Sequence, residues 1–236
     1  TRVESSAASD VYKRQTYIIT IDGTSGSGKT TISKSLAKKL SFNLLDSGKL
    51  YRSAGFVYSL SKESFSDMNS IKELISKITI LSNTDSNEYE IFFENNKIDH
   101  LLYSEEVSEC ASIVSKIPEV RECMMKIQKQ CVRGKGLIAN GRDMGTEVFP
   151  EANLKLYVDA SLDIRAKRRY EELKSKGENV NFENVYKSLQ KRDESDTNRS
   201  ISPLRVPNNA EIIDTTDLKP NAIVDKILNL YTITKN

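Results

Sequence analysis

The chain has 236 residues, 38% hydrophobic and 29% charged, so it has enough apolar content for a core and carries a highly charged surface. This length suits one α/β domain with an insertion, and the net charge of only +2 argues against a dedicated nucleic-acid binder. No apolar run approaches the roughly 20 residues that a membrane-spanning helix needs.

The cysteines and the histidine indicate the compartment and exclude one kind of chemistry. Cys110, Cys123 and Cys131 have no metal-ligand spacing, and the single histidine, His100, has no partner histidine. An odd number of cysteines without a CxxC pair is typical of free thiols in a reducing compartment. We therefore expect a cytoplasmic protein that does not use a histidine dyad.

Residues 1–15, TRVESSAASDVYKRQ, show neither the apolar stretch of a signal peptide nor any helical or strand periodicity. The part SSAASDVYKRQ resembles translated sequencing-adapter sequence. We expect a leader that does not pack, either a disordered tail or a segment foreign to the protein. The folded domain is expected to cover residues 16–236.

The first part of this domain predicts alternating strands and helices. Residues 17–21 form an apolar strand, and residues 29–40 have the apolar spacing of a helix. Residues 42–45 predict a second short strand, which is followed by a helix over 46–60. Such alternation indicates a parallel sheet that helices cover on both faces.

An insertion interrupts the alternation. Residues 71–82 form a further apolar segment, and residues 88–93 and 98–103 predict two strands around a turn at 94–97. The sequence NKID in this turn matches the guanine-reading motif of GTPases, but no DxxG occurs between residues 31 and 95. We therefore interpret it as a turn in which Asn95 and Asn96 adopt left-handed geometry.

The alternation resumes after the insertion. Two helices are expected at 104–117 and 118–132, the second opened by Pro118 in its first turn. The later strands are expected at 136–140, 154–160 and 210–216, and the later helices at 162–175, 181–194 and 220–231.

A P-loop joins the first strand to the first helix. The sequence GTSGSGKT has the full spacing of Gly23, four residues, Gly28, Lys29 and Thr30. Its glycines allow backbone N–H groups to surround phosphate oxygens at a helix N-terminus. Lys29 would reach the β- and γ-phosphates of a nucleotide, and the Thr30 hydroxyl would ligate Mg²⁺. The expected ATP-binding loop residues are Gly23, Thr24, Ser25, Gly26, Ser27, Gly28, Lys29, Thr30 and Thr31.

Three polar segments predict a second site beside the P-loop. They are LLDSGKLYR (44–52), NGRDMGT (140–146) and KRDESDTNR (191–199). Ligands of open α/β sheets bind outside the carboxyl ends of the strands, and arginine suits bidentate phosphate binding. Two adjacent phosphate sites are what transfer between nucleotides requires.

With these segments, residues 16–232 resemble the bacterial cytidylate kinases, which phosphorylate CMP and dCMP with ATP. The segments DSGKLYR and GRDMGT together are quite specific to that family. The resemblance implies a P-loop NTPase-type α/β fold in three layers with a parallel central sheet. It also implies a monophosphate-binding insertion at about 71–110, which contains a small antiparallel sheet, and a lid at about 162–178. We also expect Mg²⁺ with ATP as cofactor, no nucleic-acid polymer or membrane as partner, and a monomer.

The same resemblance assigns roles to single residues. The expected catalytic residues are Lys29, Arg52, Arg142 and Arg199, and the lid would contact ATP through Arg165 and Arg168. The expected CMP-binding residues are Ser47, Tyr51, Arg52, Ser112, Arg121, Arg142, Asp143, Arg192, Asp196 and Arg199. Within that set, Arg52 and Arg142 would grip the phosphate, and Ser112, Arg121 and Asp143 would read the cytosine edge. Ser47, Arg192 and Asp196 would contact the sugar, Arg199 would sit near the phosphate and base, and Tyr51 would line the pocket.

Several of these residues have a simpler explanation. Asp46 or Ser47 could serve only as a helix cap. Ser112 and Arg121 could be solvated helix residues. Arg165, Arg168 and Arg169 could form a solvated basic face.

Four positions depart from the family pattern. Asn140 replaces a usual aspartate, Tyr103 replaces a frequent arginine, and Ser195 and Thr197 replace two further arginines. Asn140 puts the metal site in doubt, while the phosphate clamps remain. The expected reaction is transfer of the ATP γ-phosphoryl group to CMP or dCMP. The alternatives are a kinase for another monophosphate such as UMP, and a P-loop regulatory switch, which the missing DxxG disfavours.

Overall fold

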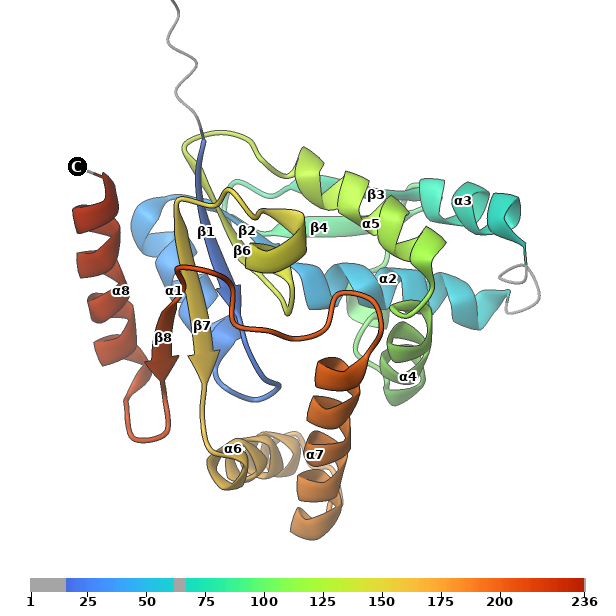
Figure 1. Cartoon of the computed structure of the whole chain (residues 1–236). Coiled ribbons are helices and arrows are strands. Elements are labelled where there is room, and N and C mark those ends of the chain that lie inside the picture. The colour runs from blue at the N-terminus through green and yellow to red at the C-terminus, as the bar shows by residue number, and fades with distance from the viewer. Residues whose placement is uncertain (1–15, 62–66, 236) are drawn as a thin grey trace, which may run out of the picture.

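The computed structural model describes residues 16–61 and 67–235 (Figure 1). The expectation about residues 1–15 falls outside these ranges. Five parallel strands form the central sheet in the order β2-β6-β1-β7-β8. In chain order the strands are β1 (Tyr17–Asp22), β2 (Asn43–Asp46), β6 (Gly136–Asn140), β7 (Leu154–Asp159) and β8 (Glu211–Asp214).

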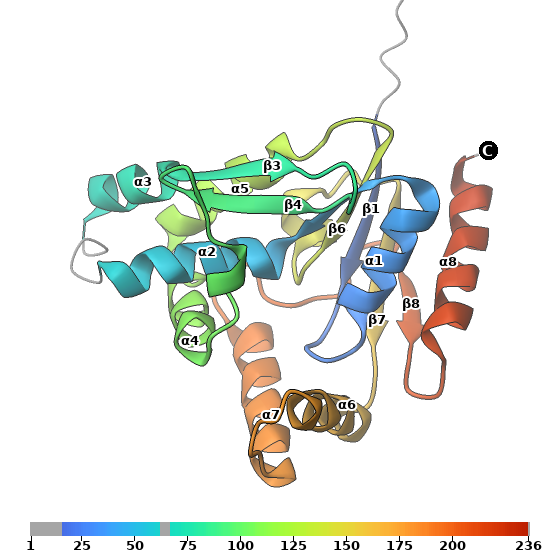
Figure 2. The same ribbon diagram turned by 180° about the vertical axis from the view of Figure 1, so that it is seen from behind.

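Helices α1 (Lys29–Leu40) and α8 (Pro220–Lys235) cover one face of this sheet, as Figure 2 shows. The buried faces of the two helices pack against buried strand residues to form the main core. Its members include Ile19, Ile21, Ile32, Leu36, Ile138, Leu156, Val158, Ile223 and Ile227. The opposite face is covered by a cluster that contains Met144, Val148 and Phe149, from a π-helical turn at Met144–Val148 and the residue after it. The predicted three-layer α/β fold with a parallel sheet is confirmed.

A second group of elements packs beside the sheet around its own core. It consists of α2 (Ser47–Leu60), α3 (Met68–Ser76), β3 (Ile78–Ser82), β4 (Tyr89–Phe93), β5 (Asn96–Lys97), α4 (Glu105–Val114) and α5 (Pro118–Gln130). Its core includes Leu50, Val57, Ile75, Ile91, Leu102 and Met124. Strands β3, β4 and β5 form the expected small antiparallel sheet.

The strand predicted over residues 98–103 is wrong. The segment 71–82 instead divides into α3 and β3, and β3 is the long partner of β4. Beyond the two residues of β5, the Asp99 carboxylate accepts the Ile91 N–H (3.0 Å) and pairs with Lys49, so the chain turns into a 3₁₀ helix at Asp99–Leu101.

The turn before β5 is confirmed, but one of its two residues was assigned wrongly. The left-handed residues are Glu94 (φ 48°) and Asn95 (φ 65°), whereas Asn96 belongs to strand β5. Two-residue hairpin turns need positive φ at adjacent positions to match the twist of the strands.

Two helices lie at the carboxyl ends of the central strands, where the P-loop also lies (Figure 1). They are α6 (Leu162–Ser175), with the predicted bounds, and α7 (Phe182–Asn198), which runs four residues further than predicted. None of the helices in the described ranges combines the length and the apolar content that crossing a membrane requires.

Candidate active site

The P-loop connects β1 to α1 through a backbone that only glycine permits at its first position. Gly23 has a φ of 141°, and a Cβ there would lie 1.9 Å from the Val158 carbonyl oxygen. The loop is held by β7, which lies beside β1 in the sheet, because the Thr24 hydroxyl donates to the Asp159 carboxylate. The Ser27 hydroxyl donates to the Thr24 carbonyl oxygen (3.0 Å). These contacts fix the loop between the end of β1 and the start of α1.

Lys29 lies buried inside this loop. Its ammonium donates to the Thr24 carbonyl and, at 3.4 Å, to the Ser27 hydroxyl. Burial lowers the pKa of Lys29 well below its ordinary value, and the positive charges of Arg142 and Arg192 lower it further. Anionic phosphate oxygens beside the ammonium would favour its charged form. The two arginines also indicate that the second polar cluster lies close to the P-loop lysine.

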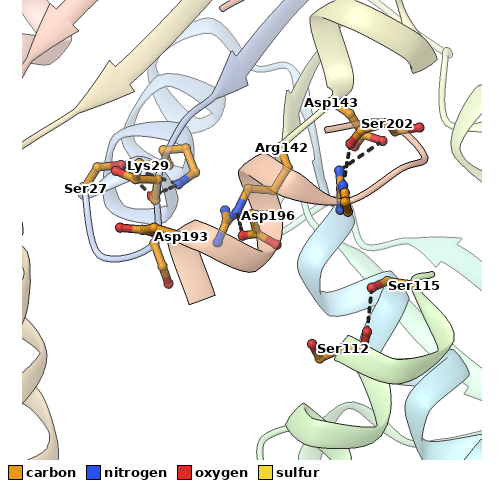
Figure 3. A network of polar contacts seen from close by, with 12 residues as sticks. Ser27, Lys29, Ser112, Ser115, Arg142, Asp143, Asp193, Asp196 and Ser202 are labelled. Atoms are coloured by element: carbon orange, nitrogen blue, oxygen red, sulfur yellow. Dashed lines mark hydrogen bonds and ion pairs between the residues drawn. The ribbon is translucent and has the colours of Figure 1, made fainter. Parts of the chain in front are cut away.

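That second cluster contains three ion pairs around the turn after β6. The Arg142 Nε donates to Asp196 Oδ2 at 2.7 Å, which joins the turn to α7. Asp143 forms a buried ion pair with Arg121 of α5, and the Arg199 guanidinium lies 3.7 Å away. Figure 3 shows Arg142 and Asp196 between the Lys29 side and the Asp143 side of the site.

The arginines of the cluster keep its carboxylates charged. Burial alone would raise the pKa of Asp196, but the charge and hydrogen bond of Arg142 hold it below its ordinary value. The Arg121 guanidinium lies over the Tyr51 ring at 5.5 Å. Burial raises the pKa of Tyr51 to about 12, so its hydroxyl stays protonated. The arrangement presents arginines and carboxylates to a polar, anionic ligand.

Three other predicted acceptor residues lie around this cluster in different ways. The Arg52 guanidinium lies 5.1 Å from the centre of the Tyr103 ring. Ser47 is buried and accepts a hydrogen bond from Gln128 (2.9 Å). Ser112 is exposed on α4, where its carbonyl accepts from the Ser115 hydroxyl, and no bond joins it to Arg121 or Asp143 (Figure 3).

The capping alternative is resolved in favour of Asp46. Its carboxylate accepts the Lys49 N–H at the start of α2, so Ser47 is not the cap.

The basic helix α6 does not present a uniformly solvated face. Arg165 is 5% exposed and donates to the Ser25 carbonyl (3.1 Å) and to Asp193 of α7 (2.6 Å). Arg168 donates to the carbonyl oxygen of Thr215 at 2.6 Å. Only Arg169 of this trio fits the solvated explanation, since its side chain is 42% exposed and pairs with Glu172 within its own helix.

The predicted metal ligand Thr30 has one polar neighbour from the sheet. The Asn140 Nδ2 donates to Thr30 Oγ1 at 3.3 Å. The Asn140 Oδ1 is buried and has no hydrogen-bond partner among the described residues. A buried acceptor without a donor, next to the hydroxyl of a P-loop threonine, fits a metal-bound water. No group of three or more acidic, histidine or cysteine side chains suited to a metal occurs in residues 16–61 and 67–235.

Sequence reasoning missed several residues that hold the site together. Asp22 and Asp159 each end a buried strand and bind a neighbouring loop. Gln128 lies one and two helical turns beyond Met124 and Arg121 on the buried face of α5, and it orients Ser47. An acid at the end of a buried strand, and a glutamine on a buried helix face, were the signals available.

A P-loop at the carboxyl edge of a parallel sheet, next to a second cluster of arginines and aspartates, defines a P-loop phosphotransferase. The family model described as cytidylate kinase matches residues 19–233. The chain therefore belongs to the cytidylate kinase family.

Individual relatives agree with this assignment. The cytidylate kinase of Carboxydothermus hydrogenoformans is 40% identical over 212 residues, which cover 90% of this chain and 96% of the relative. The cytidylate kinase of Marinomonas sp. is 41% identical over 211 residues, which cover 89% of this chain and 93% of the relative. That of Caldanaerobacter subterraneus is 39% identical over 209 residues, which cover 89% of this chain and 92% of the relative.

Proposed function

We propose that this protein transfers the γ-phosphoryl group of ATP to CMP or dCMP, giving ADP and CDP or dCDP. The observation that carries the proposal is the cluster of Arg121, Asp143 and Arg199, which lies next to the Arg142–Asp196 pair and the P-loop lysine. Family membership supports the same reaction. A site with one nucleotide-phosphate loop and no second anion-binding cluster would suit a switch instead.

Base recognition in this proposal depends on a carboxylate paired with an arginine. Cytosine offers an exocyclic amine as donor, with N3 and O2 as acceptors. Asp143 keeps further lone pairs beyond the bond to Arg121, so it can accept from the amine while an arginine donates to the acceptors. A purine or an unmatched pyrimidine edge would leave these buried groups unpaired, which costs affinity.

The chemistry in this proposal is positioning and charge stabilisation. The acceptor phosphate oxygen is already anionic, so it attacks the γ-phosphorus in line without a general base or a covalent intermediate. Lys29 stabilises the phosphates in the P-loop, while Arg142, Arg52 and Arg199 hold the acceptor phosphate. Mg²⁺, when bound with ATP, supplies further neutralisation of phosphate charge. Thr30 would hold the metal, and the free Asn140 Oδ1 would accept from one of its waters.

The remaining expected roles belong to the same proposal. Residues 71–110 would close on the monophosphate, and residues 162–178 would form a lid that excludes water from the reaction. Arg165 and Arg168 reach the P-loop side of the molecule through Ser25 and Thr215, which supports placing them at the ATP side. Three free cysteines suit a cytoplasmic location. A monomer is the proposed oligomeric state, and light scattering measures its mass in solution.

The test is a panel of acceptors with ATP, followed by ADP formation. We expect high kcat/KM for CMP and dCMP, a lower value for UMP, and very low values for AMP and GMP. Activity with AMP equal to that with CMP would contradict the base-reading assignment. A preference for UMP would indicate the other monophosphate kinase, and absence of ADP with every acceptor would contradict the proposed function.

A further inference from the structure

The turn after β6 is fixed to the end of β1 by three backbone N–H groups. Gly141 donates to the Ile21 carbonyl oxygen at 3.0 Å. Met144 donates to Asp22 Oδ1 at 2.8 Å, and Gly145 donates to Asp22 Oδ2 at 2.7 Å. The Asp22 side chain is fully buried. Both carboxylate oxygens are therefore used to hold one turn.

Arg142 and Asp143 are the two residues between these fixed points. Neither contacts Asp22 through a hydrogen bond, and each instead pairs with a residue of the acceptor cluster. The positions of both side chains therefore depend on where Asp22 holds the flanking backbone.

The turn lies directly on the carboxylate. A Cβ added at Gly145 would lie 2.8 Å from Thr20 Oγ1, 2.9 Å from Pro207 Cγ and 3.2 Å from Asp22 Oδ2. Distances under 3.0 Å require a neighbour to move. The sequence thus places glycine where the turn must approach the end of β1 closely.

A buried carboxylate in this place is costly, which indicates a specific role. Burial raises the pKa of Asp22 to about 6, the two backbone N–H bonds oppose the rise, and the nearby charges of Asp143 and Lys29 act in opposite directions. A shorter apolar residue would avoid this cost but would leave two backbone N–H groups without acceptors. The carboxylate is the side chain that accepts from both.

We propose that Asp22 is the positioning residue that sets the Arg142–Asp143 turn in register with the P-loop, and thereby sets the acceptor site relative to the donor. This inference rests on the proposed function. Asp22 makes no hydrogen bond to Lys29, Arg142 or Asp143, and it acts on the acceptor cluster through the turn. Its loss is expected to affect the acceptor site much more than ATP binding, which depends on Asp22 only through its charge near Lys29.

The first test variant is Asp22→Asn, which keeps the shape and one acceptor oxygen but turns an NH₂ group toward a backbone N–H. We expect the KM for CMP to rise at least tenfold and kcat/KM for CMP to fall by at least that factor. The Kd for ATP, measured by calorimetry without CMP, should change less than twofold. A general loss of folding would instead shift both substrates together.

The comparison variant is Asp159→Ala, at the end of the neighbouring strand β7. The Oδ1 atom of Asp159 accepts both the Thr24 hydroxyl and the Ala160 N–H (2.9 Å), so it holds the P-loop. Alanine removes this acceptor, whereas asparagine would keep an oxygen in its place. We expect the opposite pattern, with a weaker Kd for ATP and a smaller change in the Kd for CMP. Opposite patterns from substitutions at the ends of two neighbouring strands cannot arise from lost stability alone.

A second variant covers the case in which Asp22→Asn does not fold. Gly145→Ala places a methyl group between the turn and the end of β1, which pushes the turn away from Asp22. It should give the same selective rise in KM for CMP. Equal effects on ATP and CMP, or no effect on either, in whichever variant folds would overturn the inference. Failure of the proposed function is separate, because it would appear as a natural protein that does not phosphorylate CMP.

Discussion

Replacement of Arg142 by alanine tests the acceptor-phosphate clamp. We expect kcat/KM for CMP to fall by about 10³-fold, as for transition-state arginines in other phosphoryl transfers, which corresponds to about 4 kcal/mol. Arg142→Ala also removes the ion pair with Asp196, and the structure limits the size of this second contribution. The Arg142–Asp196 ion pair has side chains that are 18% and 19% exposed, so losing it should cost about 1 kcal/mol, or about fivefold.

The two contributions separate in a double-mutant cycle with Asp196→Asn. Most of the effect of Arg142→Ala should persist in the Asp196→Asn background, because the phosphate contact does not pass through Asp196. Arg142→Lys should also lose at least tenfold, since lysine keeps the charge but lacks the two-pronged guanidinium. The assay is steady-state ADP formation over a range of CMP concentrations, with circular dichroism as the folding control. A loss below tenfold for Arg142→Ala in a folded protein would refute the clamp and leave Arg142 a structural role.

Two further predictions concern the leader and pH. Because residues 1–15 show no apolar or capping pattern, deleting them should leave kcat/KM and the Tm unchanged; a Tm lower by several degrees would contradict this. The pKa of Asp22 is raised from 3.8 to about 6 in the folded protein, so its protonation adds stability at low pH, and this contribution is lost as the pH rises through 6. Between pH 7.5 and pH 5 the natural protein should gain about 1.4 kcal/mol from this group, and Asp22→Asn should not. Urea unfolding of both proteins at the two pH values measures this contribution. If the free energies of unfolding of the natural protein and Asp22→Asn differ by the same amount at pH 7.5 and at pH 5, the raised pKa of Asp22 is refuted.

Central elements could be predicted from the sequence because their signals are local. The strand Gly136–Asn140 has the predicted bounds, since a buried parallel strand is a continuous apolar run. The helix Lys29–Leu40 and the P-loop also follow from contiguous residues. In contrast, β5 has two residues and depends on pairing with β4. Its end depends on the contact between Asp99 and Lys49, which are far apart in the chain.

The site was predictable as a set of residue types but not as a set of pairs. The helical spacing of Arg165 allowed a solvated face, and its burial depends on Ser25, 140 residues away, and on Asp193 of another helix. Arg121 has the same ambiguity, which the buried pair with Asp143 removes. Local patterns give residue identity and helix face, whereas the partner of a charge depends on tertiary packing.

Asn140 lies beside Thr30, the predicted metal ligand. Its amide donates to the Thr30 hydroxyl, and its carbonyl oxygen stays free at the end of a buried strand. An amide oxygen can accept from a metal-bound water, but it brings no charge. Mg²⁺ bound to nucleotide phosphates keeps several waters and needs few protein ligands. The amide should therefore weaken the metal site without abolishing it.

We accordingly predict that the natural protein is active and that Asn140→Asp changes kcat by less than about tenfold, or roughly 1.4 kcal/mol. The aspartate should lower the Mg²⁺ concentration for half-maximal rate, because it adds a negative charge and can accept the Thr30 hydroxyl proton, which leaves the lone pairs of that oxygen for the metal. The measurement is kcat against Mg²⁺ concentration for both proteins, together with the Kd for ATP at low and high Mg²⁺ as a readout that does not depend on turnover. Asn140→Ala is the control, since it removes the acceptor without adding charge and should need more Mg²⁺ than the natural protein. An inactive natural protein that the aspartate rescues a hundredfold or more would refute this reasoning, because the amide would then have disabled the site.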